Sequence, residues 1–132
     1  QDTEWVVDTA ASYHVTSHRE YFLTYQAGDF GAVKMGNTSS AEIVGMGDIQ
    51  VKTNIGYTIT LKDVRHVSSL RLDLLSSIVF DRQGYDNIFN NGAWKMTKGS
   101  IVTAQGHICG TLYKTHVKIC VDSLNTMERE AS

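Results

Sequence analysis

The sequence contains no proline and only two cysteines, Cys109 and Cys120, among its 132 residues. Two cysteines cannot build a scaffold of several disulfides, so we expect free thiols in a reducing compartment. A formal net charge of −2 provides no strongly basic face, which argues against direct binding of nucleic acid. No apolar run approaches the roughly 20 residues that span a bilayer. Residues 1–4 also lack the pattern of a secretory signal, so we expect no membrane partner.

Eleven glycines, together with β-branched and aromatic residues in short segments, indicate one compact, mostly β domain. The clearest hairpin joins the alternating segments 48–52 and 57–61. Short C-terminal hairpins are predicted at Asn91-Gly92, at Lys98-Gly99, and at Gly106 or Gly110. One short helix is predicted over residues 77–83, where Ser76 or Ser77 is the cap and Gly84 follows the end.

The strongest constellation for chemistry is Trp5-Val6-Val7-Asp8-Thr9-Ala10-Ala11-Ser12. Here a carboxylate follows a short apolar run at a turn of small and hydroxyl side chains, which lets a second chain approach closely. Two carboxyl groups that share one proton can hydrolyse a peptide bond, one as base towards water and the other as acid towards the carbonyl. The alternative reading is that Asp8 only caps a turn.

The Asp8 turn resembles the Asp-Thr/Ser-Gly-Ala signature of retropepsin-like aspartic proteases. The likeness is strongest to the protease region of copia-type LTR retrotransposon polyproteins of plants, and it spans most of residues 5–84. The stretches that carry it are WVVDTAASYHVT from Trp5, GDFGAVKMGN from Gly28, GMGDI from Gly45, LKDVRHV from Leu61 and LRLDLLS from Leu70.

The resemblance implies a retropepsin-like closed β-sheet domain over residues 1–84 with one short helix. It implies that Asp8 is the catalytic carboxylate and that the Thr9 hydroxyl interlocks across a dimer, while Ala10 stands where glycine is usual. Ser76 also stands where the family has glycine. Residues 85–121 resemble the segment before integrase, and residues 122–132 read as a polar tail or linker. Three roles are open to residues 85–121: they extend the sheet, seal a dimer or form a bridge.

A hairpin over about residues 33–45 falls where the resemblance places a flap over the substrate. We expect strands at 30–35 and 41–44 around a tip of small residues, although an ordinary surface hairpin is the alternative. The expected flap residues are Met35, Gly36, Asn37, Thr38, Ser39 and Ser40. The candidates for binding substrate side chains are Val15, Ile43, Val44 and Leu74.

The chain contains one Asp-Thr/Ser-small unit, so the second carboxylate has to come from another copy. The resemblance therefore implies an aspartic endopeptidase that works as a homodimer without metal or cofactor. Its substrate would be the Gag-Pol polyprotein of its own element, cut in cytoplasmic virus-like particles. The alternative is a weak or inactive retroelement fragment that serves as a dimeric interaction module.

Two further readings remain open. Zinc would have four potential ligands in His107, Cys109, His116 and Cys120, but their spacing is not that of a common zinc finger. Asp8, Ser12 and His14 contain the residue types of a hydrolytic triad. They lie within seven positions on one turn, whereas a serine nucleophile normally receives its base from elsewhere in the fold.

Overall fold

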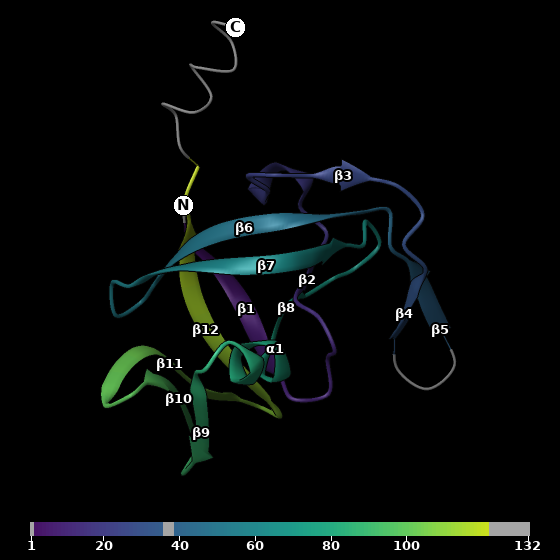
Figure 1. Cartoon of the computed structure of the whole chain (residues 1–132). Coiled ribbons are helices and arrows are strands. Elements are labelled where there is room, and N and C mark those ends of the chain that lie inside the picture. Colours follow the sequence, from purple (N-terminus) through teal and green to yellow (C-terminus); the bar gives the residue numbers. More distant parts are fainter. Residues whose placement is uncertain (1, 36–38, 122–132) are drawn as a thin grey trace, which may run out of the picture.

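The computed structural model describes residues 2–35 and 39–121, which form a mostly β structure (Figure 1). The strands are β1 (Asp2–Asp8), β2 (Val15–Thr16), β3 (Gln26–Ala27), β4 (Ala32–Met35), β5 (Ser39–Glu42), β6 (Gly45–Thr53), β7 (Thr58–His66), β8 (Asp73–Ser76), β9 (Asp86–Asn90), β10 (Ala93–Lys98), β11 (Ile101–Cys109) and β12 (Leu112–Ile119). The helical elements of this part are α1 (Ser77–Arg82) and the 3-10 turn η1 (Arg19–Tyr21). The prediction of a mostly β fold with one short helix is confirmed.

A closed β-barrel is formed by strands in the order β6-β7-β2-β8-β1-β12, because β12 pairs in turn with β6. β1 and β12 run antiparallel and side by side (Figure 1), and their pairing ends at Val7↔Tyr113. On its other side β1 runs parallel to β8, and this pairing ends at Asp8↔Ser76. β1 therefore has a hydrogen-bonded neighbour on both sides, and Asp8 is its last residue.

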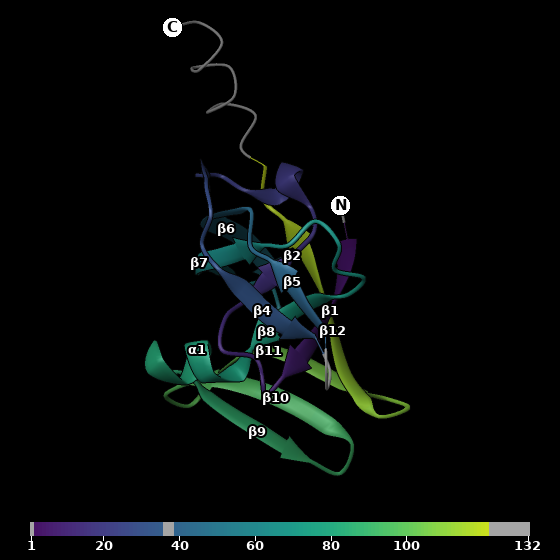
Figure 2. The same cartoon turned by 90° about the vertical axis from the view of Figure 1, so that its right-hand side faces the viewer.

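The strands β11, β10 and β9 continue the sheet outward from β12 and lie below the barrel in both views (Figures 1 and 2). Asn91 and Gly92 join β9 to β10 with φ values of 51° and 75°. Two successive positive φ angles are typical of the type I′ turn of a two-residue hairpin, so the hairpin predicted here is confirmed. Of the three roles left open for residues 85–121, the structure shows the extension of the sheet.

One hydrophobic core is shared by the barrel and by these outer strands. Trp5 of β1 is 0% exposed, Trp94 of β10 is 1% exposed, and both belong to the same cluster of buried side chains. The two tryptophans thus join the barrel and the outer strands in one core. The C-terminal strands also contribute Met96, Ala104, Val117 and Ile119 to this cluster.

The hairpin of β4 and β5 forms a separate two-stranded sheet beside the barrel (Figure 1) and faces the viewer in Figure 2. Its pairing runs from Ala32↔Glu42 to Met35↔Ser39. The expected loop tip at 36–40 was too long, because Ser39 and Ser40 pair with β4 instead of lying in the loop. Small hydroxyl residues tolerate such ladder positions. The expected flap residues Gly36, Asn37 and Thr38 lie outside the described residues.

The helix α1 begins and ends close to the predicted positions. Ser76 is its N-cap, and Gly84, with φ of 90°, follows its end at Arg82. A left-handed conformation directly after a helix favours glycine, because a side chain is strained there. Within the described part of the chain, no helix has the length and apolar character needed to cross a membrane.

Candidate functional site

Asp8 lies where the buried strand β1 emerges from the barrel. Val6 and Val7, directly before it, are each 5% exposed, whereas Thr9 and Ala10 after it are exposed. Asp8 itself is half-buried, and its Oδ1 accepts a hydrogen bond of 2.8 Å from the backbone N–H of Ala10. The carboxylate is thus oriented by its own turn at the rim of the barrel. Ala10 is exposed, so its methyl group is accommodated at this turn.

Ser76 connects this turn to the helix α1. Its side chain is fully buried, and its Oγ donates a hydrogen bond of 2.7 Å to the carbonyl oxygen of Ala11. The same Oγ accepts the backbone N–H of Val79 at 3.2 Å, which caps the helix. A glycine at position 76 would provide neither bond. Ser76 thus fastens the Asp8 turn to the start of α1.

His14 holds the other end of the turn. The backbone N–H of Ser76 donates to His14 Nδ1 at 2.9 Å, so the ring proton resides on Nε2. Nε2 is buried without a hydrogen-bond partner among the described residues. The ring packs against Phe80 of α1 with centroids 4.7 Å apart. Burial lowers the pKa of His14 to about 3, so the neutral ring is an acceptor at physiological pH.

Three hollows surround Asp8, and Asp8 and Leu74 line all of them. The β12 hollow, of about 570 Å³, is lined by Val6, Val7, Asp8, Thr9, Leu72, Leu74, Phe89, Thr111, Leu112 and Tyr113. The turn hollow, of about 590 Å³, is lined by Asp8, Ala10, Ala11, Ser12, Tyr13, Val15, Ala32, Val33, Lys34 and Leu74. The hairpin hollow, of about 500 Å³, is lined by Asp8, Lys34, Ser39, Ser40, Ala41, Ser69, Leu70, Arg71, Leu72 and Leu74. Asp8 is the one carboxylate among these lining residues.

The structure brings some of the predicted substrate-binding residues to Asp8 and places others elsewhere. Val15 and Leu74 line the turn hollow, as expected of cleft residues. Ile43 is 3% exposed in a second hydrophobic cluster with Val15, and Val44 is half-buried beside it. Neither Ile43 nor Val44 lines one of the three hollows.

The β4–β5 hairpin borders two of the hollows. Val33 and Lys34 of β4 line the turn hollow, and Ser39 and Ser40 of β5 line the hairpin hollow. Met35 is the last residue of β4. The hairpin therefore lies on the same side of Asp8 as these two hollows.

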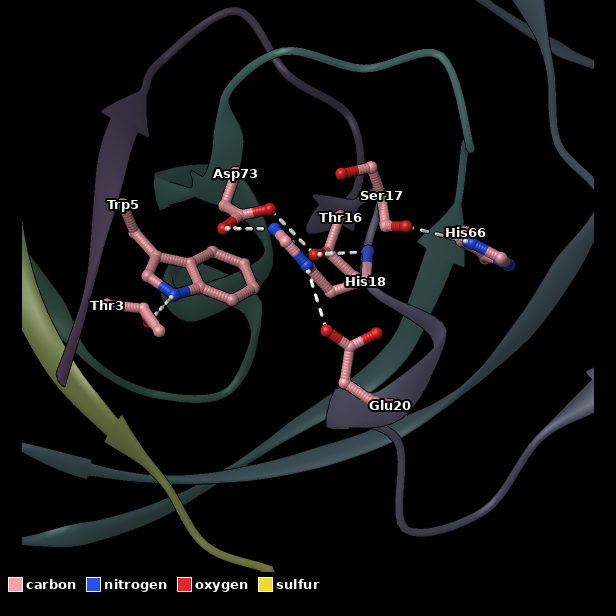
Figure 3. A network of polar contacts seen from close by, with 8 residues as sticks. All are labelled: Thr3, Trp5, Thr16, Ser17, His18, Glu20, His66 and Asp73. Carbon is pink, nitrogen blue, oxygen red and sulfur yellow. Dashed lines mark hydrogen bonds and ion pairs between the residues drawn. The ribbon is translucent and has the colours of Figure 1, made fainter. Parts of the chain in front are cut away.

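A polar cluster with two carboxylates, which the sequence did not reveal, lies at the start of β8 (Figure 3). The Oδ1 of Asp73 accepts a 2.7 Å hydrogen bond from Thr16 Oγ1, and its Oδ2 lies 4.0 Å from His18 Nε2. His18 Nδ1 lies 3.1 Å from Glu20 Oε2. Burial raises the pKa of Asp73, while the bond from Thr16 acts in the opposite direction. The cluster joins β8 to β2 and η1.

Asp73 is not placed to work with Asp8. In the parallel pairing of β1 and β8, Asp73 is opposite Trp5 and Ser76 is opposite Asp8. A strand rises roughly 3.3 Å per residue, so three positions separate the two carboxylates by about 10 Å along the sheet. A pair that shares a proton has to be within hydrogen-bonding distance.

The zinc reading finds no support in the geometry. Over residues 2–35 and 39–121, no three or more His, Cys, Asp or Glu side chains gather closely enough to hold a metal ion. Cys109 is exposed at the end of β11, and Cys120 follows β12 as a half-buried free thiol.

Comparison with known proteins identifies the family. Residues 5–85 match the model of the Pol polyprotein beta-barrel domain. The chain is 56% identical over 131 residues to the "Retrovirus-related Pol polyprotein from transposon TNT 1-94" of Nicotiana tabacum, a match that covers 99% of this chain and 10% of that protein. The chain thus spans about a tenth of the relative's length. No solved structure matches it. The chain belongs to the family of Pol polyprotein beta-barrel domains and is a region of a retrotransposon Pol polyprotein.

Proposed function

We propose that this chain is one half of a retropepsin-type aspartic endopeptidase from a copia-type element. The observation that carries the proposal is the position of Asp8, the one carboxylate lining three adjoining hollows at the rim of the barrel. A single carboxylate at such a place is an incomplete acid–base pair. A second copy related by a two-fold axis would supply its own Asp8 and complete the site.

In the proposed reaction the two Asp8 carboxyl groups share one proton. The ionised carboxylate takes a proton from a water molecule, whose oxygen attacks the carbonyl carbon of the peptide bond. The protonated carboxyl donates its proton to the carbonyl oxygen. The carboxyl that took the proton from water then gives it to the nitrogen, and the carbon–nitrogen bond of the tetrahedral intermediate breaks, so that the amine leaves. The other carboxylate takes a proton from a hydroxyl of the intermediate, which becomes the carboxylic acid product, and the pair again shares one proton. Thr9, which is exposed beside Asp8, would make the proposed interlocking contact between copies.

The β4–β5 hairpin is the proposed flap. Its strands border the turn hollow and the hairpin hollow, so a peptide in these hollows would lie between the hairpin and Asp8. Covering the peptide excludes bulk water from the reacting groups. Val15 and Leu74, which line the turn hollow, are the proposed contacts for substrate side chains, and Ile43 would act through the packing of Val15.

The proposed substrate is the Gag-Pol polyprotein of the same element, cut inside cytoplasmic virus-like particles. The relative with 56% identity is itself a Pol polyprotein, of which the matched region forms 10%. A protease embedded in such a chain would release its neighbours by cutting the peptides between them.

The alternative function is a dimeric interaction module without catalysis. Ala10 and Ser76, which stand where the retropepsin family usually has glycine, favour it. Each nevertheless fits its surroundings, because Ala10 is exposed and Ser76 makes two hydrogen bonds through its Oγ. The two functions make the same prediction for dimerisation and opposite predictions for cleavage.

The deciding experiment follows processing of a longer polyprotein precursor that contains this region. We expect Asp8→Asn to abolish cleavage with an unchanged melting temperature, because the half-buried asparagine keeps the size of the side chain and an Oδ1 that accepts the Ala10 N–H, and loses only the charge. Asp86→Asn, at an exposed position of β9, is the matched control and should cleave like the wild type. Cleavage by the purified chain should also rise more steeply than in proportion to its concentration. If Asp8→Asn and Asp86→Asn process the precursor equally, the protease function is contradicted and only the interaction module remains.

A further inference from the structure

The β12 hollow is built partly by strands that lie beyond the region of the family match. Residues 5–85 match the family model, whereas Phe89 comes from β9, Thr111 from the turn before β12, and Leu112 and Tyr113 from β12 itself. The pairing of β1 with β12 ends at Val7↔Tyr113, one residue before Asp8. The start of β12 therefore lies next to Asp8, and this position follows from the closure of the barrel.

The lining of the β12 hollow is mostly apolar. Its polar groups are the carboxylate of Asp8 and the hydroxyls of Thr9, Thr111 and Tyr113, while the other six lining residues are aliphatic or are phenylalanine. The rings of Phe89 and Tyr113 meet edge to face with centroids 5.0 Å apart, which gives this side a rigid aromatic wall.

Two large apolar side chains at this hollow are left exposed. Leu72, just before β8, is 44% exposed, and Leu112, the first residue of β12, is 37% exposed. Exposed apolar side chains that adjoin a hollow and a carboxylate indicate a surface that a ligand covers. The lining contains no lysine or arginine, so an anionic ligand group would have no partner there, and Asp8 is the one group that could pair with a cation.

We propose that the β12 hollow binds a large apolar side chain of the substrate next to the scissile bond, and that Leu112 sets the size of that side chain. This inference rests on the proposed protease function. A peptide whose scissile bond lies at Asp8 carries its flanking side chains within one residue of that point, and the β12 hollow begins there. The segment beyond residue 85 thus supplies one wall of the catalytic cleft.

The test uses the chain in its full length and peptides that differ only at the residue before the cut, with Ala, Leu or Phe. In the wild type we expect kcat/KM to be highest for Leu or Phe. Leu112→Trp fills the hollow and should shift the ratio of kcat/KM for Phe over Ala by about ten-fold or more towards Ala. Leu112→Ala should shift it towards Phe.

The matched control is Ile108→Ala. Ile108 lies on β11 of the same hairpin, is 42% exposed and does not line the β12 hollow. This variant should keep the wild-type ratio. If the Leu112 variants cleave with the wild-type ratio, the inference is overturned and the protease function stands. If they change the dimerisation constant and leave the ratio unchanged, a second copy covers Leu112, which also overturns the inference.

A second measurement separates the inference from the proposed function. Binding of two uncleavable peptide mimics with a hydroxyl at the scissile position, one with Leu and one with Ala before it, is measured by calorimetry. A preference for Leu that Leu112→Trp removes supports the binding of an apolar side chain in the β12 hollow, even where the wild type cuts nothing and the protease function therefore fails. If neither mimic binds and no peptide is cut, both proposals are overturned.

Discussion

The family model matches residues 5–85 and does not extend over residues 86–121. The two regions are nevertheless not separate in structure. The strand β1 of the first region lies between β8 of its own region and β12 of the second. Trp5 and Trp94, one from each region, are buried in one core. The comparison teaches that the boundary of a family model need not be a boundary of folding. If the two regions form one cooperative unit, changes in either should affect both.

The largest expected effect comes from cutting the chain between the regions. We expect residues 1–85 alone to show no cooperative unfolding transition in urea, because β1 and β6 both lose β12 as a neighbour. The unpaired strands would expose backbone groups and apolar side chains. Near-ultraviolet circular dichroism of the fragment and of the full chain provides the measurement.

Mixing the fragment with residues 86–132 sharpens this result. We expect the near-ultraviolet signal to return on mixing, because the second fragment supplies the missing strand. A cooperative transition in residues 1–85 alone would contradict the view that the two regions are one unit.

The next largest effect is expected from a matched pair of core substitutions. Trp5→Ala and Trp94→Ala should each lower the free energy of unfolding by about 3–5 kcal/mol, in a single transition, because both side chains are fully packed in the shared core. Ile101→Ala, at a position that is 51% exposed, should change it by less than about 0.5 kcal/mol. Two transitions in the Trp94 variant, one of them at the wild-type midpoint, would show that the regions unfold independently.

A pH-dependent effect is expected to originate in the first region, at His14. In the unfolded chain His14 binds a proton as the pH falls below 6.5. In the folded chain the pKa of His14 is about 3, so the ring stays neutral down to that pH. The free energy of unfolding should therefore fall as the pH decreases between these values, by about 1.4 kcal/mol per unit. Burial raises the pKa of Asp73, so this carboxyl opposes the trend above its unfolded value of 3.8.

Urea denaturation at pH 7 and pH 4 measures this difference. His14→Gln keeps a hydrogen-bond acceptor for Ser76 and does not ionise, so its loss of stability between the two pH values should be smaller by roughly 3 kcal/mol. His107→Gln, at an exposed position of the second region, should behave as the wild type. If His14→Gln loses as much stability between pH 7 and pH 4 as the wild type does, His14 binds a proton in the folded wild type over this range, and the prediction is contradicted.

The smallest effect concerns the attachment of the Asp8 turn. Ser76→Ala removes the bond to the Ala11 carbonyl and the cap of α1, and should lower the free energy of unfolding by about 1–2 kcal/mol. Ser68→Ala, at an exposed position of the loop before β8, is the control. The Asp8 turn is thus attached through residues of the first region, whereas the β12 hollow beside it is also lined by residues of the second region. A loss in Ser76→Ala no greater than in Ser68→Ala would contradict this attachment.

Local features of the fold could be predicted from the sequence because their causes are local. The alternation of polar and apolar residues indicated the hairpin of β6 and β7, and Asn91-Gly92 indicated the hairpin of β9 and β10. Ser76 before an apolar run indicated the start of α1. The emergence of Asp8 from a buried strand could also be predicted, because three apolar residues precede it and small residues follow.

The less accurate predictions depended on contacts between distant residues. The tip of the β4–β5 hairpin was predicted too long because Ser39 and Ser40 have little strand preference, yet β4 offers them partners. Ile43 looked available for substrate, but Val67 and Leu70, more than twenty residues away, cover it. The serine at position 76, where the resemblance expected glycine, was the one signal that could have revealed its bond to the Asp8 turn.

The sequence by itself determined that strands and tight turns would form and that one carboxylate would stand at a turn of small residues. Both follow from side-chain chemistry over a few neighbouring positions. Only the tertiary structure decided that β12 lies between β1 and β6, and that Leu112 therefore lies beside Asp8. Strand pairing uses backbone groups that every residue carries, so the choice of a distant partner depends on how the whole core packs.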